Sequence, residues 1–228
     1  MGVLVDGNRR WAREQGEHSP SLGHHAGAEK IIDLLSWCSE FGIPHTTIYL
    51  LSTDNISKRP GPELNELLEI ILQLGERLAA MQRWRLQVVG DMDLLPEPAV
   101  ARLRKVESKT AGLPAPHVNL AIAYGGRTEI AAAIRSIIRS HAERGAGIDE
   151  LADLLTPELI AEHLYTGGQP DPDLLIRTSG EQRLSGFLLW QSANSEFYFA
   201  EALWPDFRKV DFLRALRAFQ NRHRRFGG

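Results

Sequence analysis

Short runs of apolar residues alternate along this chain with longer segments in which apolar residues recur every three or four positions. The short runs have the length of strands, and the longer segments have the spacing of amphipathic helices. The predicted strands are residues 2–5, 46–51, 85–89, 117–123, 174–177 and 196–199. The predicted helices are residues 31–41, 63–82, 97–109, 128–144, 157–165 and 210–225. Because strands that alternate with helices need crossover connections, we predict an α/β fold, a single domain over residues 1–228 with a central, mainly parallel six-stranded sheet flanked by helices.

Composition narrows the class of protein. The net charge of −3 argues against a protein that binds nucleic acid through a basic surface. Cys38 is the only cysteine, so no intramolecular disulfide can form, and its place on the apolar side of a helix indicates a buried hydrophobic residue. No apolar stretch approaches the ~20 residues of a transmembrane helix. The first polar cluster begins at residue 6 and leaves no room for a cleavable signal peptide. We therefore expect a cytoplasmic protein. It would be in peripheral contact with a membrane only if its substrate is a hydrophobic lipid.

The first polar cluster follows directly on the strand at residues 2–5. It reads Asp6-Gly7-Asn8-Arg9-Arg10-Trp11. In parallel sheets, ligands bind at the carboxyl ends of the strands. Backbone N–H groups and arginine side chains together suit a phosphate group, and Asp6 could hold the Mg²⁺ that accompanies a diphosphate. Taken alone, the same stretch also fits an ordinary strand–turn–helix with solvated charges.

Three further polar clusters follow predicted strands. They are Ser52-Thr53-Asp54-Asn55 with Lys58 and Arg59, Tyr124-Gly125-Gly126-Arg127, and Arg177-Thr178-Ser179-Gly180-Glu181-Gln182-Arg183-Leu184-Ser185. The last combines arginines, hydroxyl groups and a glycine, which we interpret as a phosphate cradle to which a helix start would add its dipole. The alternative is a polar loop with a helix cap at Ser185. Because the sequence has no zinc-binding, P-loop or GxGxxG pattern, the predicted phosphate site uses no common nucleotide motif.

The order of these motifs resembles that of the cis-prenyltransferases, the family that includes undecaprenyl diphosphate synthase. The resemblance adds Gly23-His24 and Trp204-Pro205-Asp206-Phe207, and it runs from residue 1 to the closing Arg225-Phe226-Gly227-Gly228. It implies a homodimeric α/β enzyme with an apolar tunnel. Such an enzyme uses Mg²⁺ to condense an allylic diphosphate with isopentenyl diphosphate, and it forms a new Z double bond.

The resemblance also implies how the two diphosphates would be bound. Asp6 would hold Mg²⁺ and assist departure of the allylic diphosphate, and Glu196 would reach the metal from the partner subunit. The residues that would bind the allylic diphosphate are Gly7, Asn8, Arg9, Arg10 and His24. The residues that would hold the diphosphate of isopentenyl diphosphate are Arg177, Arg183 and Ser185. Further residues expected to bind substrate, without assignment to one of the two diphosphates, are Trp11, Ser52, Thr53, Asp54, Arg59 and Leu184.

Two further roles come from the same resemblance. Asn55, with Ser52 near it, matches the position assigned to proton removal. An amide is a poor base, so Asn55 would orient a proton relay rather than take the proton itself. The tail Arg225-Phe226-Gly227 resembles a terminal motif that closes over the neighbouring site.

Three positions depart from the family pattern. The usual motif is Asp-Gly-Asn-Gly-Arg, and here Arg9 replaces the second glycine, where it could crowd or recharge the loop. An arginine commonly precedes the Gly-His element, and residues 17–22 contain none. The usual tryptophan after Asn55 is an isoleucine, and the next arginine motif is shifted by one residue, so that either Lys58 or Arg59 could take its role.

Leu50 bears on the length of the product. Long-chain members carry a small residue where Leu50 stands, and a leucine there should act as a wall against a growing chain. Short-chain members that make Z,E-farnesyl diphosphate from geranyl diphosphate look similar here and share Gln182-Arg183-Leu184-Ser185-Gly186-Phe187. We therefore predict a short product such as Z,E-farnesyl diphosphate. The alternatives are a medium- or long-chain (decaprenyl or undecaprenyl) diphosphate synthase, or a non-catalytic prenyltransferase-like subunit. Leu50 could also be only a core residue that faces a helix.

Overall fold

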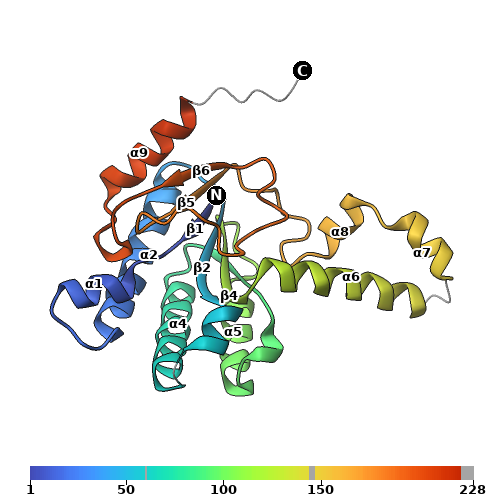
Figure 1. Cartoon of the computed structure of the whole chain (residues 1–228), viewed down its shortest axis with the longest axis horizontal. Coiled ribbons are helices and arrows are strands. Elements are labelled where there is room, and N and C mark those ends of the chain that lie inside the picture. Colours follow the sequence, from blue (N-terminus) through green and yellow to red (C-terminus); the bar gives the residue numbers. More distant parts are fainter. Residues whose placement is uncertain (60, 144–146, 222–228) are drawn as a thin grey trace.

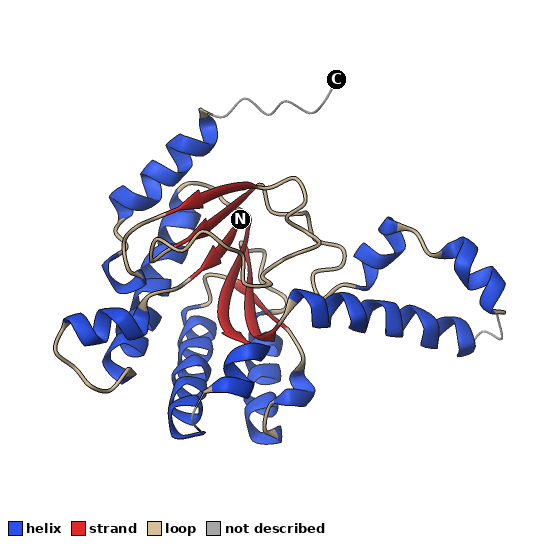
Figure 2. Ribbon diagram, viewed as in Figure 1, coloured by secondary structure: helices blue, strands red, loops and turns tan. Residues whose placement is uncertain are grey.

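Six strands form one sheet in the order β3-β4-β2-β1-β5-β6, and all neighbouring strands are parallel (Figures 1 and 2). The computed structural model describes residues 1–59, 61–143 and 147–221. The strands are β1 (Gly2–Leu4), β2 (His45–Ser52), β3 (Arg85–Val89), β4 (His117–Tyr124), β5 (Leu174–Arg177) and β6 (Glu196–Phe199). The predicted α/β fold with a six-stranded sheet is confirmed.

The helices lie between the strands, as crossover connections require. They are α1 (Asn8–Glu14), α2 (Ser21–Glu40), α3 (Thr53–Lys58), α4 (Gly61–Met81), α5 (Glu97–Thr110), α6 (Gly126–Glu143), α7 (Ile148–Leu154), α8 (Pro157–His163) and α9 (Lys209–Gln220). The helices α1, α3 and α7 were not predicted; they have only six or seven residues, a length at which a helical repeat is weak. The predicted helix at 210–225 extends beyond the described residues, which end at 221.

The two faces of the sheet are covered differently. Alternate strand residues such as Val3, Ile48 and Leu120 join the large core that α2, α4 and α5 build on one face. Their neighbours Leu4 and Ala121 face a smaller cluster on the other side. That cluster is completed by a segment without regular structure. The apolar side chains that this segment contributes are Leu184, Phe187 and Leu188. The helix start expected near Ser185 is therefore wrong, because the chain packs there as successive turns.

The helix α6 follows the carboxyl end of β4 and projects from the body, with α7 and α8 folding back along it (Figure 1). Among the described residues, none of the helices combines the length and the apolar character needed to cross a membrane.

A buried carboxyl group ties the base of α6 to the second face of the sheet. Glu129 is 1% exposed. Its oxygens accept hydrogen bonds from the Tyr124 hydroxyl, from the backbone N–H of Tyr165 at 3.0 Å, and from Gln191 Nε2 at 3.2 Å. Burial raises the pKa of Glu129 above its ordinary value. One side chain thus joins β4, α6, the loop after α8 and the segment around residue 191.

We expect this carboxyl group to make stability depend on pH in a defined direction. The unfolded chain ionises Glu129 near its ordinary pKa of 4.5, and the folded protein ionises it at a higher pH. Between these two pKa values the unfolded state therefore binds fewer protons than the folded state. The stability that Glu129 contributes is thus fully present below pH ~4.5 and is lost as pH rises through the folded pKa. The stability of the wild type relative to Glu129→Gln should fall as pH is raised from ~4.5, measured by denaturant unfolding. The exposed Glu14→Gln should show no such slope, and a flat difference for Glu129→Gln would contradict the argument.

Candidate active site

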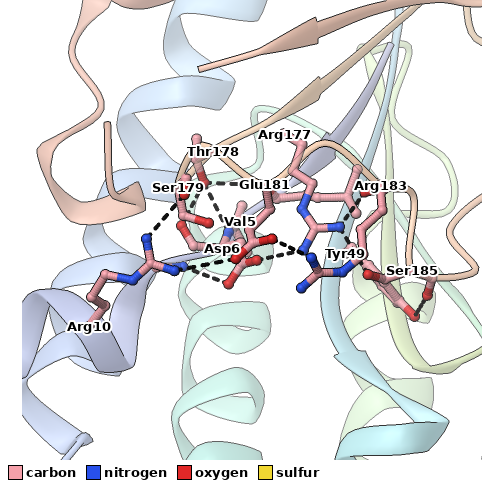
Figure 3. A network of polar contacts seen from close by, with 12 residues as sticks. Val5, Asp6, Arg10, Tyr49, Arg177, Thr178, Ser179, Glu181, Arg183 and Ser185 are labelled. Carbon is pink, nitrogen blue, oxygen red and sulfur yellow. Dashed lines mark hydrogen bonds and ion pairs between the residues drawn. The ribbon is translucent and has the colours of Figure 1, made fainter. Parts of the chain in front are cut away.

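The carboxyl ends of β1 and β5 bring Asp6 and Arg177 together (Figure 3). Arg177 Nη2 lies 2.7 Å from Asp6 Oδ2, and the Arg177 side chain is 5% exposed whereas that of Asp6 is 44% exposed. A buried guanidinium needs a carboxylate partner, because an unpaired buried charge is costly. Asp6 Oδ1 also accepts a hydrogen bond from the Gly7 backbone N–H at 2.8 Å. The carboxylate is thus fixed at the rim with one side open to solvent.

Thr178 locks the end of β1 against the end of β5. Its hydroxyl donates to the Asp6 carbonyl at 2.6 Å and accepts from the Asp6 backbone N–H at 3.0 Å. Because both bonds are to backbone, the position of Asp6 does not depend on its own side chain. Thr178 belonged to the predicted phosphate cradle but was not assigned a role.

The far side of the Arg177 guanidinium holds the segment after β5. Arg177 Nη1 donates to Ser185 Oγ at 2.9 Å and to the Arg183 carbonyl (Figure 3). Tyr49 also reaches this segment, since its hydroxyl lies 3.4 Å from the Ser185 carbonyl and its ring stacks on Phe187 at 4.8 Å. Burial raises the pKa of Tyr49 to about 12, so the hydroxyl remains a donor.

The loop after β1 approaches α2 closely, and glycines allow it. Gly7 has a φ of 111°, in the left-handed region that favours glycine. A Cβ at Gly23 would lie 2.0 Å from the Asn8 carbonyl oxygen, and one at Gly27 would lie 2.5 Å from Asn8 Oδ1. No side chain fits at either place. The glycines of α2 therefore let the start of α1 sit against it and bring His24 to the same pocket.

Glu63, in the first turn of α4, lies close to two arginines and a histidine. Its Oε1 lies 2.9 Å from Arg59 Nη1, 3.3 Å from Arg9 Nε and 3.8 Å from His24 Nε2. Burial, together with the charge of Arg59, lowers the pKa of His24 to about 4 and outweighs the nearby carboxylate. His24 is therefore neutral at physiological pH.

Glu181 forms a third carboxylate contact, with cations from two parts of the chain. Arg10 Nη2 lies 3.4 Å from Glu181 Oε1, and Arg10 Nη1 donates to the Ser179 carbonyl at 3.1 Å. Arg183 pairs with the other oxygen of Glu181 (Figure 3). The helix α1 is thereby tied to the segment after β5.

These residues surround one pocket of about 430 Å³, within the range of small-molecule sites. Its lining includes thirteen of the predicted site residues: Asp6, Gly7, Asn8, Arg9, Arg10, His24, Leu50, Ser52, Asp54, Asn55, Arg59, Arg177 and Ser185. Several of their polar atoms are buried without a hydrogen-bond partner among the described residues: Asn8 Oδ1, His24 Nδ1, Arg59 Nε and Arg177 Nε. A pocket rich in guanidiniums suits a ligand with several anionic oxygens, such as a diphosphate.

Ser52 and Asn55 lie beside each other at the end of β2. Ser52 caps α3, because its hydroxyl accepts the Asn55 backbone N–H at 2.9 Å. Asn55 Oδ1 accepts from Arg59 Nη2 at 3.4 Å. Of the two alternatives at the shifted arginine motif, Arg59 lines the pocket, whereas Lys58 forms an exposed ion pair with Asp54 at 2.7 Å.

A β-bulge turns Leu50 toward the pocket. Tyr49 pairs with Ala121 and Leu51 pairs with Ile122, so Leu50 is an extra residue in β2. Leu50 and Leu67 line both the main pocket and a smaller cavity of about 30 Å³ behind it. The other lining residues of that cavity are mostly apolar, among them Ile31, Ile71, Leu74 and Trp204. Leu50 is thus at the boundary between a polar and an apolar space.

Five predicted site residues do not line the pocket of this chain: Trp11, Thr53, Arg183, Leu184 and Glu196. The Trp11 indole N–H donates to Asp206 at 2.9 Å, and Leu184 packs in the smaller core. Glu196 begins β6 beside Leu174, at the edge of the sheet opposite to Asp6. The tail 225–227 lies outside the described residues.

The polar cluster after β4 also lies away from the pocket. The Gly126 backbone N–H donates to the Gly186 carbonyl at 2.8 Å, and a Cβ at Gly126 would come within 2.8 Å of Leu189. The glycine pair therefore serves close packing of two backbone segments rather than binding of phosphate.

Two residues that shape the pocket belong to none of the predicted clusters, Arg13 and Glu63, and a third, Glu181, lies in the predicted phosphate cradle but was not assigned a role. Arg13 follows Arg10 by three residues, so helical spacing could have placed it on the same face. Glu63 and Glu181 carry no such signal, because an acidic residue in a first helical turn or in a polar loop is common.

The comparisons with known proteins agree with this geometry. The model of the undecaprenyl diphosphate synthase family matches residues 4–227. A short-chain Z-isoprenyl diphosphate synthase of Mycobacterium leprae is 54% identical over 228 residues, which are 100% of this chain and 87% of that protein. A (2Z,6E)-farnesyl diphosphate synthase of Thermobifida fusca is 56% identical over 227 residues, which are 100% of this chain and 89% of that protein.

A solved structure extends the similarity to the fold. The crystal structure of lavandulyl diphosphate synthase from Lavandula x intermedia, in complex with dimethylallyl diphosphate, matches with a TM-score of 0.91 at 34% sequence identity. The match covers 100% of this chain and 97% of that one. A family match over nearly the whole length, with relatives this similar, shows that the chain belongs to the undecaprenyl diphosphate synthase family, the cis-prenyltransferases that its motifs resemble.

Proposed function

We propose that this protein condenses isopentenyl diphosphate with geranyl diphosphate to make (2Z,6E)-farnesyl diphosphate. The observation that carries the proposal is the pocket itself, in which Asp6 stands among guanidiniums and Leu50 also borders a mostly apolar cavity. A prenyl diphosphate likewise has an anionic head and an apolar chain. The names of relatives such as the synthase of Thermobifida fusca support this substrate pair. We place the reaction in the cytoplasm. The single cysteine, Cys38, is buried and free, as is usual in a reducing compartment, where disulfides are rare.

The donor set around Asp6 fits Mg²⁺. Mg²⁺ is commonly bound by one or two carboxylates together with substrate phosphates and water. Asp6 offers an oxygen at the rim of the pocket, and no group of three acidic, histidine or cysteine residues lies together in the described part of the chain. Asp6 would therefore hold the ion jointly with the diphosphate. When bound, Mg²⁺ would neutralise the negative charge that develops on the leaving diphosphate.

The chain's own residues supply the rest of the binding. The allylic diphosphate would be held by Arg9, Arg10 and His24, together with the turn at Gly7-Asn8 that begins α1 (the Asn8 turn). The second diphosphate would lie near Arg177 and Ser185, with Arg183 at the rim. Because these donors are held by carboxylates and backbone carbonyls before substrate arrives, little reorganisation is needed as charge develops. Asn55 would orient the proton relay, since its amide is already fixed by Arg59.

The apolar side of the pocket favours a short product. The cavity behind Leu50 and Leu67 has a volume of about 30 Å³, which is room for little more than a water molecule. A product that grew by further isoprene units would have to displace these packed side chains. A medium- or long-chain synthase is the alternative, and the product length decides between them.

The central test is the charge of Asp6. Asp6→Asn keeps an oxygen for the Gly7 N–H but removes the charge, so we expect kcat to fall by about 10²–10³, as for other groups that stabilise developing charge. Turnover would be measured with labelled isopentenyl diphosphate and geranyl diphosphate as a function of Mg²⁺ concentration. The exposed Asp33→Asn on α2 is the matched control and should retain activity. A near wild-type rate for Asp6→Asn would remove the proposed role.

Leu50→Ala tests the chain-length wall. The smaller side chain opens a path to the cavity lined by Ile31 and Ile71, so longer products should appear when isopentenyl diphosphate is in excess. Chromatography of the products measures the change, and the exposed Leu213→Ala on α9 should leave the distribution unaltered. A wild type that already makes chains of ten or more units would contradict the wall, although the cis-prenyltransferase assignment would stand.

The position of Glu196 leads us to propose a homodimer with shared sites. Glu196 is three residues before the end of β6, about 10 Å along the strand from the edge that carries Asp6. A role at the metal would therefore require the Glu196 of a second subunit.

Mixing two inactive variants tests this arrangement. A heterodimer of Asp6→Asn and Glu196→Gln subunits has one intact site, so random exchange should restore roughly a quarter of wild-type activity. Native mass spectrometry would confirm that subunits exchange. If exchange occurs and no activity returns, Glu196 does not act across the interface.

A further inference from the structure

Glu63 contacts Arg9, Arg59 and His24, three residues that line the pocket, without lining it itself. Its side chain is 12% exposed. A carboxylate in this position cannot contact substrate through the wall that its partners form. Its effect must pass through them.

The geometry at Arg59 decides where His24 carries its hydrogen. Arg59 Nη1 has two N–H bonds: one donates to Glu63 Oε1 at 2.9 Å, and the other points to His24 Nε2 at 3.3 Å. A guanidinium can only donate, so Nε2 must be the acceptor. The distance from Nε2 to Glu63 Oε1, 3.8 Å, is too long for a hydrogen bond. The ring hydrogen is therefore on Nδ1.

The surroundings of His24 keep the ring uncharged as well. The residue is 5% exposed, and the charged groups that face it are Arg59, Arg9 and Glu63. Burial and the arginines favour the neutral ring, and Nδ1 is a buried atom without a partner among the described residues. A buried N–H donor without an acceptor is uncommon, and it is expected where a ligand supplies the acceptor.

We propose that Glu63 is a positioning residue, which through Arg59 holds His24 as a neutral ring with its hydrogen on Nδ1, ready to donate to an oxygen of the bound diphosphate. The identity of that diphosphate rests on the proposed function, but the place of the hydrogen is a property of the free protein. His24 then contributes a fixed donor beside the charges of Arg9 and Arg59. Because the carboxylate already fixes these groups, binding does not have to order them.

Nitrogen-15 NMR of histidine-labelled free protein tests the tautomer directly. The signals of His24, assigned with His24→Asn, should show a neutral ring protonated at Nδ1 at pH 7. Arg59→Met removes the donor to Nε2, so the ring should move toward the Nε2–H form, which can then donate to Glu63. A wild-type ring that is charged or protonated at Nε2 would overturn the proposal, as would an unchanged tautomer in Arg59→Met. The wild-type measurement requires no variant to fold.

Kinetics and binding test the role of Glu63. Glu63→Ala should raise KM for the allylic diphosphate, and Kd for inorganic pyrophosphate, by about tenfold, which corresponds to ~1.4 kcal/mol of lost positioning. The value of kcat should change by less than about threefold, because the residue does not touch the reacting atoms. Glu66→Ala, about one turn further along α4, removes an exposed carboxylate that accepts a hydrogen bond from the Ser21 hydroxyl; it is the matched control and should leave both constants unchanged.

The outcomes separate the two proposals. Unchanged KM and Kd in Glu63→Ala, or an equal loss in Glu66→Ala, would overturn the positioning role. Absence of prenyl transfer by the wild type would instead overturn the proposed function, while the tautomer and the pyrophosphate affinity would still report on Glu63.

Discussion

Repulsion among guanidiniums is the constraint on which this site depends. Arginines from the start of α1, the end of α3 and the end of β5 point into one pocket, where like charges raise each other's energy. Three carboxylates offset the repulsion: Asp6 pairs with Arg177, Glu63 with Arg9 and Arg59, and Glu181 with Arg10 and Arg183. Each carboxylate leaves part of its partner directed to the pocket. The free protein therefore holds its anion-binding groups in place before an anion arrives, which is what rapid departure of a diphosphate requires.

The parallel sheet makes this arrangement possible. The strands β2, β1 and β5 are neighbours, so the residues that follow them meet at one edge although they are far apart in the sequence. Close approach of α1 to α2 over Gly23 and Gly27 then adds His24 and the Asn8 turn. The same edge meets an apolar space, because the core between the sheet and the helices α2 and α4 reaches the pocket at Leu50 and Leu67. A polar head and an apolar tail can thus be bound by adjoining parts of one pocket.

Much of the fold was predictable because its signals are local. The strands at 85–89, 174–177 and 196–199 were predicted to the residue, and the helices α4, α5 and α8 began or ended within two residues of the observed bounds. The short helices α1 and α3 were missed because one or two turns show no period. The helix start expected at Ser185 was wrong for a different reason. There the chain turns at Ser185, whose hydroxyl accepts a hydrogen bond from Arg177 and whose carbonyl lies against the Tyr49 hydroxyl. These tertiary contacts override the local pattern.

The sequence by itself determined the class of fold, the edge of the sheet that carries the chemistry and most residues that line the pocket, because strand periods and motif order are written in consecutive residues. Only the tertiary structure decided which side chains act together. Leu50 faces the pocket because a bulge in β2 interrupts the alternation, and a bulge depends on the register with β4. Glu63 contacts residues of the pocket because α4 packs beside α2, which brings its first turn to His24. Such contacts depend on distances between segments, and these arise only when the helices pack on the sheet.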